Sequence, residues 1–248
     1  MTQLEVRGIY AGYGSGGDIL RGVDLEIQDG AFVCLIGPNG AGKSTLLRAI
    51  SGALPPRRGR VLFEGADITG RRPDLVFRLG IVTVPQGRNT FPQMTVWENM
   101  LMGAYSIRDR AEAARRIEYA AGLFPIVVEK RHILAGNLSA GQQKQVEIAR
   151  AMVASPKVLL LDEPTLGLEP RLGRMVMDKV RELNAGGITI LLVEQNARMG
   201  LAAAREGMVM ELGQIKLHGA GEALLNDPEV KRLYLGTEVA APLPAVGR

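Results

Sequence analysis

Two kinds of hydrophobic pattern follow each other along the chain, and they predict strands of two kinds. Residues 23–27 alternate apolar and polar side chains with a period of two, which indicates a half-exposed, antiparallel strand. Leu4, Val6 and Ile9 indicate a partner strand more weakly. Three later runs are almost continuously apolar, at 31–36, 158–161 and 188–193. Such runs are typical of parallel strands that are buried on both faces.

Helix-like segments follow the buried runs. The first run precedes a predicted helix over 43–50, which Gly52 ends. The second precedes a predicted helix over 170–183, which Pro170 opens and Gly186-Gly187 ends. This alternation predicts an α/β fold with a mostly parallel, doubly wound core sheet and an N-terminal antiparallel β subdomain.

One domain is expected over residues 1–236. Residues 95–145 differ from the rest and are interpreted as a helical insertion between two halves of the core, with Asp109 as the candidate N-cap of a helix over 109–122. Residues 237–248 are rich in Ala, Pro, Val and Gly, so we expect a disordered tail there.

Composition limits the class of protein without deciding its ligand. The 248 residues are 46% hydrophobic and 23% charged, which is ordinary for a soluble globular protein. The net charge of +4 suits a polyanionic ligand, a nucleic acid or an anionic membrane surface equally well. Cys34 is the single cysteine, which excludes an internal disulfide and favours the cytosol. We expect neither a membrane span nor a secretory signal, so any role at a membrane requires a partner.

A glycine-rich segment after the first buried run fits the phosphate-binding pattern G-x4-G-K-[ST]; it comprises Gly37, Pro38, Asn39, Gly40, Ala41, Gly42, Lys43, Ser44 and Thr45. Glycines let backbone N–H groups turn inward around phosphate oxygens, and the N-terminus of the following helix adds positive partial charge. We predict that Lys43 reaches the β- and γ-phosphates of a nucleotide and that the Ser44 hydroxyl ligates Mg²⁺.

Two adjacent carboxylates end the second buried run. Consecutive side chains point apart at the end of a strand, so Asp162 and Glu163 are expected to have different tasks. We predict that Asp162 holds Mg²⁺, directly or through water, and that Glu163 polarises the attacking water as a general base. Ordinary loop carboxylates are the alternative, which the phosphate loop upstream disfavours.

A third segment precedes a predicted helix that has Val146, Ala149 and Val153 on one face. Ser139 and Gln142 have the spacing of a capping box. By itself this segment indicates no more than a well-capped helix start.

The order of the three motifs resembles that of the ATP-binding cassette (ABC) family, over about residues 3–236. The resemblance implies that Tyr13 stacks on adenine, with Tyr10 as the weaker candidate, and that Gln86 contacts Mg²⁺ and senses a transmembrane partner. The family's signature segment is matched by Ser139, Ala140, Gly141 and Gln142, with Ala140 where glycine is usual. The D-loop is matched by residues 166–169, with Glu169 where aspartate is usual.

A dimeric mechanism is what the resemblance implies. Two copies sandwich two ATP molecules, and the phosphate loop of one copy faces the signature of the other. The residues support this, because a Ser-capped helix start is an anion site at which Ser139 could bind a γ-phosphate. The cluster at 57–60, rich in arginine, is interpreted instead as a solvated loop.

The chain departs from the family at one position of the ATP site. Gln195 follows the third buried run, where most members have a histidine that touches the γ-phosphate. Glutamine donates a hydrogen bond but carries no charge, and charge-assisted bonds are roughly twice as strong as neutral ones. The chain's two histidines, His132 and His218, are interpreted as surface or packing residues. Sensing of the γ-phosphate is therefore weakened here or shared with a partner whose site has the histidine.

The same departure narrows the subfamily. Residues 193–197, together with 161–168 and the Tyr-Leu-Gly at 234–236, resemble the shorter ATP-binding subunit of bacterial branched-chain amino acid importers. This resemblance implies two membrane permease subunits, a second and longer ATPase or a second copy as dimer partner, and indirectly a periplasmic or extracellular solute-binding protein. It places the chain peripherally on the cytoplasmic face of the inner membrane. The ATPases of urea and short-chain amide importers look much the same.

Residues 88–97 suggest how a permease would be contacted. If Phe91, Met94 and Trp97 are exposed together, they suit a groove that receives a partner helix. The alternative buries Trp97 within the helical insertion.

Two rival functions remain: a soluble ABC ATPase acting on nucleic acid or ribosomes, and an inactive regulatory module. The first usually has fused cassettes or long insertions, which this chain lacks, so no nucleic acid is expected. Glu163 argues against the second.

Overall fold

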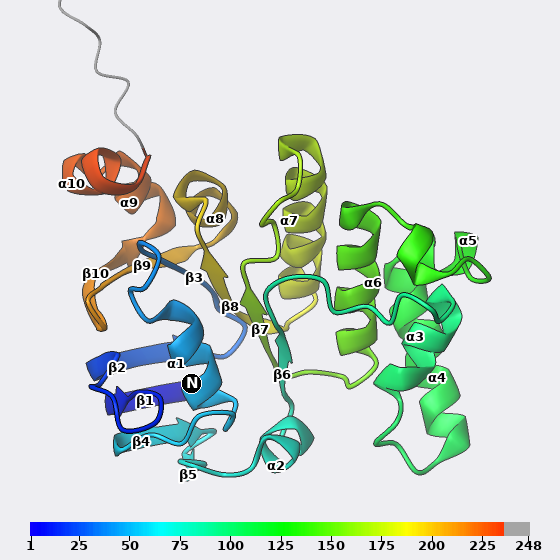
Figure 1. The fold of residues 1–248 in the computed structure, drawn as a ribbon, viewed down its shortest axis with the longest axis horizontal. Helices are drawn as coiled ribbons and strands as arrows, with labels where there is room; N and C mark the ends of the chain where they lie inside the picture. Colours follow the sequence, from blue (N-terminus) through cyan, green and yellow to red (C-terminus); the bar gives the residue numbers. More distant parts are fainter. Residues whose placement is uncertain (236–248) are drawn as a thin grey trace, which may run out of the picture.

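The computed structural model describes residues 1–235, which form two sheets flanked by helices (Figure 1). The larger sheet has six strands in the order β10-β9-β3-β8-β7-β6, and the smaller has four in the order β2-β1-β4-β5. In the larger sheet β9, β3, β8, β7 and β6 are parallel, and only β10 is antiparallel to its neighbour. The predicted α/β class with a mostly parallel core sheet is confirmed.

The smaller sheet comprises β1 (Thr2–Ala11), β2 (Leu20–Gln28), β4 (Arg58–Phe63) and β5 (Ala66–Asp67). The larger sheet comprises β3 (Phe32–Ile36), β6 (Ile81–Val84), β7 (Val158–Asp162), β8 (Thr189–Glu194), β9 (Glu206–Glu211) and β10 (Gln214–Ala220). The α-helices are α1 (Lys43–Ile50), α2 (Pro73–Arg78), α3 (Val96–Gly103), α4 (Arg110–Leu123), α5 (Pro125–Glu129), α6 (Ala140–Met152), α7 (Pro170–Ala185), α8 (Ala197–Ala203), α9 (Gly221–Asn226) and α10 (Pro228–Val230). Two further short turns of helix are η1 (Ala135–Asn137) and η2 (Lys231–Leu235).

The two hydrophobic patterns have the strand environments that they predict. Strand β2 alternates between buried and exposed residues and pairs antiparallel with β1, whereas β3, β7 and β8 are buried at every position. Alternate residues of the parallel strands enter two cores. Cys34 and Leu192 belong to the core under α6, α7 and α8, while Leu35 and Leu191 belong to the core with α1 and the smaller sheet.

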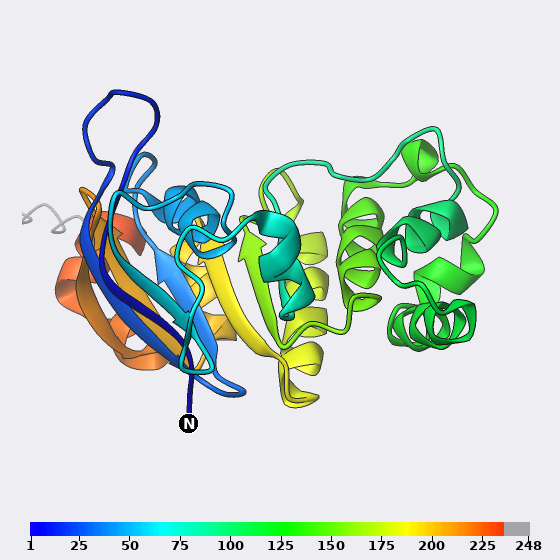
Figure 2. The same ribbon diagram turned by 90° about the horizontal axis from the view of Figure 1, so that it is seen from below.

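Residues 95–145 contribute α3, α4, α5, η1 and the start of α6, and no strand. These helices lie together beyond the β6 edge of the larger sheet, as the second view shows (Figure 2). The Asp109 carboxylate caps α4 by accepting hydrogen bonds from the backbone N–H groups of Ala111 and Glu112. The expected tail at 237–248 lies outside the described residues.

The parallel arrangement brings several loops together. Because β3, β8, β7 and β6 run in one direction, their carboxyl ends meet at one edge of the sheet. The segments after these strands carry the phosphate loop, Gln195, Glu163 and Gln86, so the sheet itself gathers residues that lie up to 158 positions apart. Among residues 1–235, no helix has the length and apolar character needed to span a membrane.

Candidate functional site

The phosphate loop folds around its own lysine. Gly40 and Gly42 have φ values of 82° and 107°, a left-handed backbone that favours glycine, and α1 begins directly after Gly42. The Lys43 side chain is buried, and its Nζ donates to the carbonyl oxygens of Gly37 at 2.8 Å and Pro38 at 3.2 Å. The loop thus places a buried positive charge at the N-terminus of a helix, which is an arrangement that suits an anion.

The two carboxylates point to different partners, as their positions at the end of β7 predict. Asp162 Oδ1 accepts a hydrogen bond from Ser44 Oγ at 3.0 Å. Burial raises the pKa of Asp162, and the hydrogen bond from Ser44 opposes this effect. Glu163 Oε2 instead accepts from Gln86 Nε2 at 3.0 Å, and its Oε1 lies 3.8 Å from Lys43 Nζ. Asp162 is therefore tied to the start of α1, whereas Glu163 faces the lysine and the segment after β6.

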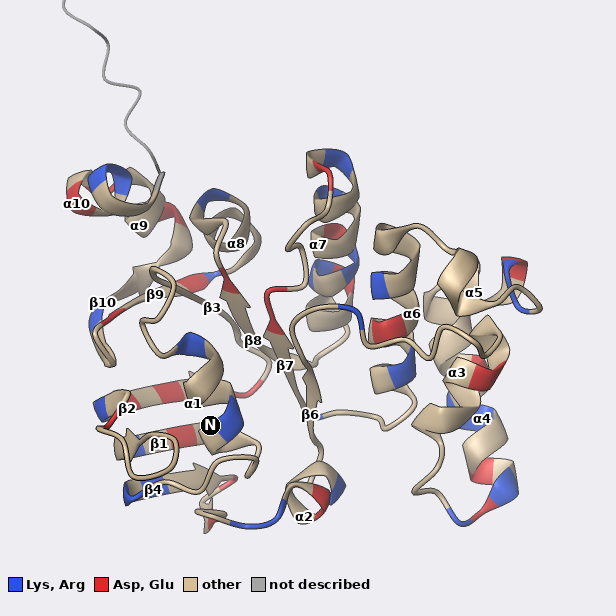
Figure 3. Ribbon diagram, viewed as in Figure 1, with Lys and Arg blue, Asp and Glu red and all other residues tan. Residues whose placement is uncertain are grey.

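A cleft of about 520 Å³ joins these groups. It is lined by the phosphate-loop residues 39, 40 and 42–45 and by Ile19, Gln86, Glu163, Leu166 and Gln195. Acidic segments at the ends of β7 and β8 lie at the edge of the sheet where α1 begins with a basic residue (Figure 3). The structure thus brings together Gln86, Glu163, Gln195 and the phosphate loop, as their motifs predict.

Tyr13 stands outside this lining, on the loop between β1 and β2, which projects from the molecule (Figure 2). Its ring is 44% exposed, and its hydroxyl accepts a hydrogen bond from Arg48 at 2.7 Å. Arg57 holds the same loop by donating to the carbonyl oxygens of Gly14 at 2.7 Å and Gly16 at 2.8 Å. Residues 57–60 are exposed, as the interpretation of a solvated loop requires, but the loop assignment is wrong for 58–60, which belong to β4, and Arg57 is bonded to the Tyr13 loop.

The Ser139 segment is not part of the cleft. Ser139 is the exposed N-cap of α6; its Oγ accepts from the Gln142 N–H at 3.4 Å, and Gln142 Oε1 accepts from the Ser139 N–H at 3.1 Å. This is the capping box that the spacing predicts. Neither Ala140 nor Gly141 lines the phosphate-loop cleft, so within one chain the Ser139 segment and this cleft are separate.

A second cleft, of about 240 Å³, lies between the core sheet and the helices of the insertion. Phe77, Phe91, Met102 and Arg150 are among its lining residues. Trp97 does not line it: the indole is partly buried against the core, with the Arg131 guanidinium 4.0 Å from the ring centroid. Of the three apolar residues predicted for a groove, Phe91 lines this cleft, and Met94 and Trp97 do not.

Comparison with known proteins identifies the family of this chain. The family model described as ABC transporter matches residues 20–166, which is more than half of the chain. The chain belongs to the ABC transporter family. It is an ATPase of that family, as the relatives and structural neighbours of the cassette are.

Three curated relatives cover nearly the whole cassette. The high-affinity branched-chain amino acid transport ATP-binding protein BraG of Pseudomonas aeruginosa is 39% identical, over 88% of this chain and 93% of its own length. The probable branched-chain amino acid transport ATP-binding protein LivF of Archaeoglobus fulgidus is 35% identical, over 88% and 92%. The lipopolysaccharide export system ATP-binding protein LptB of Escherichia coli is 32% identical, over 96% and 99%.

Two solved structures bear on the nucleotide and on assembly. The ADP conformation of MJ1267, an ATP-binding cassette of an ABC transporter, superposes with a TM-score of 0.86 at 33% identity, covering 96% of this chain and all of the other. The dimeric structure of MJ0796, a bacterial ABC transporter cassette, superposes with a TM-score of 0.77 at 25% identity, covering 88% of this chain and 98% of the other.

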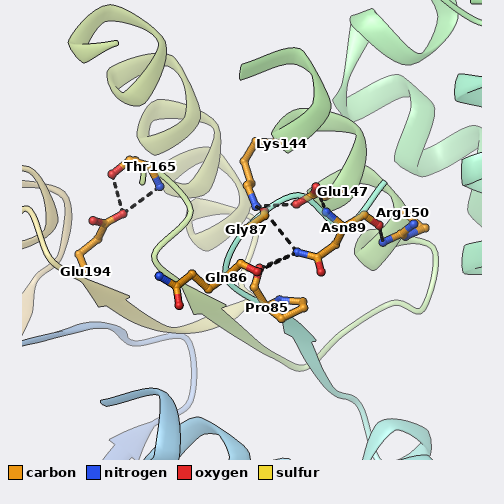
Figure 4. Close-up of polar contacts among 9 residues, drawn as sticks. All are labelled: Pro85, Gln86, Gly87, Asn89, Lys144, Glu147, Arg150, Thr165 and Glu194. Atoms are coloured by element: carbon orange, nitrogen blue, oxygen red, sulfur yellow. Dashed lines mark hydrogen bonds and ion pairs between the residues drawn. The ribbon is translucent and has the colours of Figure 1, made fainter. Parts of the chain in front are cut away.

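Two contacts in the cassette were not predictable from its motifs (Figure 4). Glu194 Oε1, at the end of β8, accepts hydrogen bonds from the N–H and the hydroxyl of Thr165. The buried pair Lys144 and Glu147 on α6 holds the backbone after Gln86: Lys144 Nζ donates to the Gly87 carbonyl at 2.8 Å, and Glu147 accepts from the Asn89 N–H. No local pattern marks either contact, because the partners lie 29 to 58 positions apart.

Proposed function

We propose that the chain is the ATP-hydrolysing subunit that energises a membrane importer of branched-chain amino acids. The observation that carries the hydrolytic assignment is the placement of Glu163 in the phosphate-loop cleft, buried, 3.8 Å from Lys43 Nζ and hydrogen-bonded to Gln86. The assignment of the transported solute rests on the two relatives that are named as branched-chain amino acid transport proteins.

Each residue of the cleft has one task in this proposal. Lys43 and the N–H groups of the phosphate loop bind the β- and γ-phosphates, and Tyr13 stacks on the adenine. Glu163 orients the attacking water and accepts its proton, because a carboxylate beside the γ-phosphate site can act as a general base. Gln195 donates a neutral hydrogen bond to the γ-phosphate. For this step Gln86 must release Glu163, to which it is bonded at 3.0 Å.

Magnesium fits the donor set beside the phosphate loop. Ser44 Oγ and Asp162 Oδ1 lie 3.0 Å apart, and Gln86 lines the same cleft as Ser44, so these three residues would supply the oxygen ligands. Mg²⁺ prefers such oxygen ligands and usually binds phosphates together with one or two protein groups. When bound, the ion would neutralise charge on the transferred phosphoryl group.

A dimer completes the site in this proposal. Ser139 caps α6 far from the phosphate loop of its own chain, and the dimeric MJ0796 structure shows that cassettes of this fold pair. The partner is either a second copy or a different, longer ATPase. Each of the two permeases would bind one chain of the dimer, at the cleft lined by Phe77, Phe91 and Met102. This contact would keep the ATPase on the cytoplasmic face of the membrane.

Export of lipopolysaccharide is the second candidate, because LptB aligns over 96% of this chain. Urea or a short-chain amide is the alternative to branched-chain amino acids as the imported solute. Nucleic acid or the ribosome is the alternative to a permease as the partner of the chain.

Purification of the tagged chain from its native membranes in mild detergent, followed by mass spectrometry, separates these candidates. Two polytopic permeases and a second ATPase, with ATP-dependent uptake of leucine by the reconstituted complex, are the expected result. Components of an export machine, or ribosomes and nucleic acid without permeases, would overturn the importer while leaving the ATP chemistry in place.

A further inference from the structure

A buried carboxylate joins the loop after β7 to the end of β8. Glu194 is the last residue of β8 and is 1% exposed. Its Oε1 accepts two hydrogen bonds from Thr165, one from the backbone N–H at 3.1 Å and one from the hydroxyl at 2.7 Å (Figure 4). Burial raises the pKa of Glu194, and the bonds from Thr165 oppose this effect. Glu194 does not line the nucleotide cleft, so direct contact with ATP does not explain this residue.

The contact lies between two residues of the ATP site. Thr165 is two positions after Glu163, and Glu194 directly precedes Gln195. Both Glu163 and Gln195 line the phosphate-loop cleft, whereas Thr165 and Glu194 line a neighbouring cleft of about 380 Å³, to which Gln195 also belongs. The Glu163 N–H also donates to the Val193 carbonyl at 2.9 Å. Three hydrogen bonds therefore join the Glu163 loop to the last two residues of β8.

Glu163 needs such support because of its backbone. Its φ of 46° lies in the left-handed region, which a residue with a Cβ adopts at a cost in free energy. Strained conformations of this kind persist only where the surrounding structure fixes them. The Val193 carbonyl fixes the backbone at Glu163, and Glu194 fixes it two residues later.

We propose that Glu194 is a positioning residue for ATP hydrolysis: through Thr165 it holds Glu163 in its left-handed conformation and at a fixed distance from Gln195. This inference rests on the proposed role of Glu163 as the general base. It predicts a defect in the rate of hydrolysis and none in nucleotide binding, because within the described residues no hydrogen bond joins the phosphate loop to the side chain of Thr165 or of Glu194.

The opposite end of β8 offers a matched control. Thr189 opens the strand, is fully buried, and its hydroxyl accepts a hydrogen bond from the Gly30 N–H at 2.7 Å. Thr189→Val and Thr165→Val each remove one buried threonine hydroxyl, the first at the start of β8 and the second bonded to its last residue. Only Thr165 is close to the phosphate-loop cleft. A merely structural role would give the two variants the same effect.

The test measures kcat and KM for ATP, together with thermal unfolding, on the full chain purified with the subunits that accompany it. For Thr165→Val we expect kcat to fall about ten- to hundredfold, the effect of losing a hydrogen bond to a charged group, with KM changed less than about twofold. Thr165→Ser keeps the hydroxyl and should retain kcat within about threefold. Thr189→Val should lower the unfolding temperature and leave kcat unchanged.

A double-mutant cycle assigns the effect to the pair. Glu194→Gln keeps a carbonyl oxygen that can accept both bonds but loses the charge, so its kcat should fall by less than that of Thr165→Val. Glu194→Ala removes the bonds from both the N–H and the hydroxyl of Thr165, so it should lose at least as much as Thr165→Val, which removes only the second. Adding Thr165→Val to Glu194→Ala should cause no further loss. Additive losses, or a kcat for Thr165→Val equal to that of Thr189→Val, would overturn the proposal.

The result separates this inference from the function on which it rests. Glu163→Gln, assayed in the same preparation, tests the general base itself. If it leaves hydrolysis unchanged, the proposed role of Glu163 fails. If it slows hydrolysis while Thr165→Val does not, only the positioning role of Glu194 fails.

Discussion

Two helix starts in this molecule are proposed to meet a phosphate, and they differ in what surrounds them. The start of α1 has a buried lysine, a hydroxyl bonded to Asp162, and both Gln86 and Glu163 across the same cleft. The start of α6 has an exposed serine whose hydroxyl is occupied by its own capping box. The first start is surrounded by charged and polar groups of its own chain, and the second is separate from them.

In the proposed dimer, this difference assigns the two helix starts to different chains at each ATP. The α1 start collects groups from the ends of four parallel strands, because the sheet directs all of those ends to one edge. The α6 start lies on the helical side of the molecule, beyond β6, where the sheet delivers no such group (Figure 1). An anion site without catalytic neighbours is useful if a second chain brings the phosphate to it.

The largest effect is expected at the α1 site. Glu163→Gln keeps the size of the side chain and its bond to Gln86, but it removes the group that accepts a proton from water. Hydrolysis should slow by about 10²–10⁴-fold, while ATP affinity is preserved. Single-turnover hydrolysis and nucleotide binding by isothermal titration measure the two quantities separately.

Glu206→Gln is the matched control, since it removes an exposed carboxylate from β9 and should change neither quantity. An unchanged rate in Glu163→Gln would remove the general base from the α1 site. The difference between the two helix starts would then concern binding alone.

The sequence predicts those features of the two helix starts that consist of successive residues. The phosphate loop, the Asp162-Glu163 pair and the Ser139 capping box each occupy a few successive residues, and local backbone geometry requires those residue types there. The buried parallel strands are predictable for the same reason, because burial on both faces leaves a continuous apolar run.

Contacts between distant segments were beyond that reasoning. The bond between Thr165 and Glu194 joins positions 29 apart, and Arg57 reaches Gly14 from 43 positions away. Neither Thr165 nor Arg57 stands out by its neighbours in the sequence, so local patterns indicate neither contact. Only the register of the strands shows that these side chains meet.

A smaller effect is expected at the α6 start, where a variant tests whether this start acts on the ATP of the partner chain. Ser139→Ala removes a hydroxyl that we assign to the γ-phosphate bound by the partner chain. Hydrolysis by the assembled dimer should fall about ten- to hundredfold, because a hydrogen bond to a charged group is lost. ATP binding by the isolated chain should stay unchanged, since Ser139 is separate from its own cleft.

Loss of a cap also destabilises a helix, by about 1 kcal/mol, so the variant needs a control for that effect. Thr95→Ala removes the N-cap of α3, which has the same kind of capping box with Glu98. It should lower stability as much as Ser139→Ala does without slowing hydrolysis. Weaker ATP binding by the isolated Ser139→Ala chain would contradict the separation of the two sites.

The smallest effect concerns the edge of the α1 site, where Gln195 supplies a neutral donor. Gln195→His introduces a side chain that is charged below its ordinary pKa of about 6.5 and neutral above it. A charge-assisted bond is roughly twice as strong as a neutral one, so hydrolysis by a dimer of identical chains should rise about fivefold at low pH. The sign follows from the protonated form: the ratio of the variant rate to the wild-type rate should be largest near pH 6 and should decline toward one as the imidazole loses its proton.

Gln195→Leu, which neither donates nor titrates, should give a ratio below one that does not change with pH. A pH-independent loss of rate in Gln195→His would instead mean that the cleft is adjusted to the shape of glutamine, so that the missing charge does not limit this ATPase.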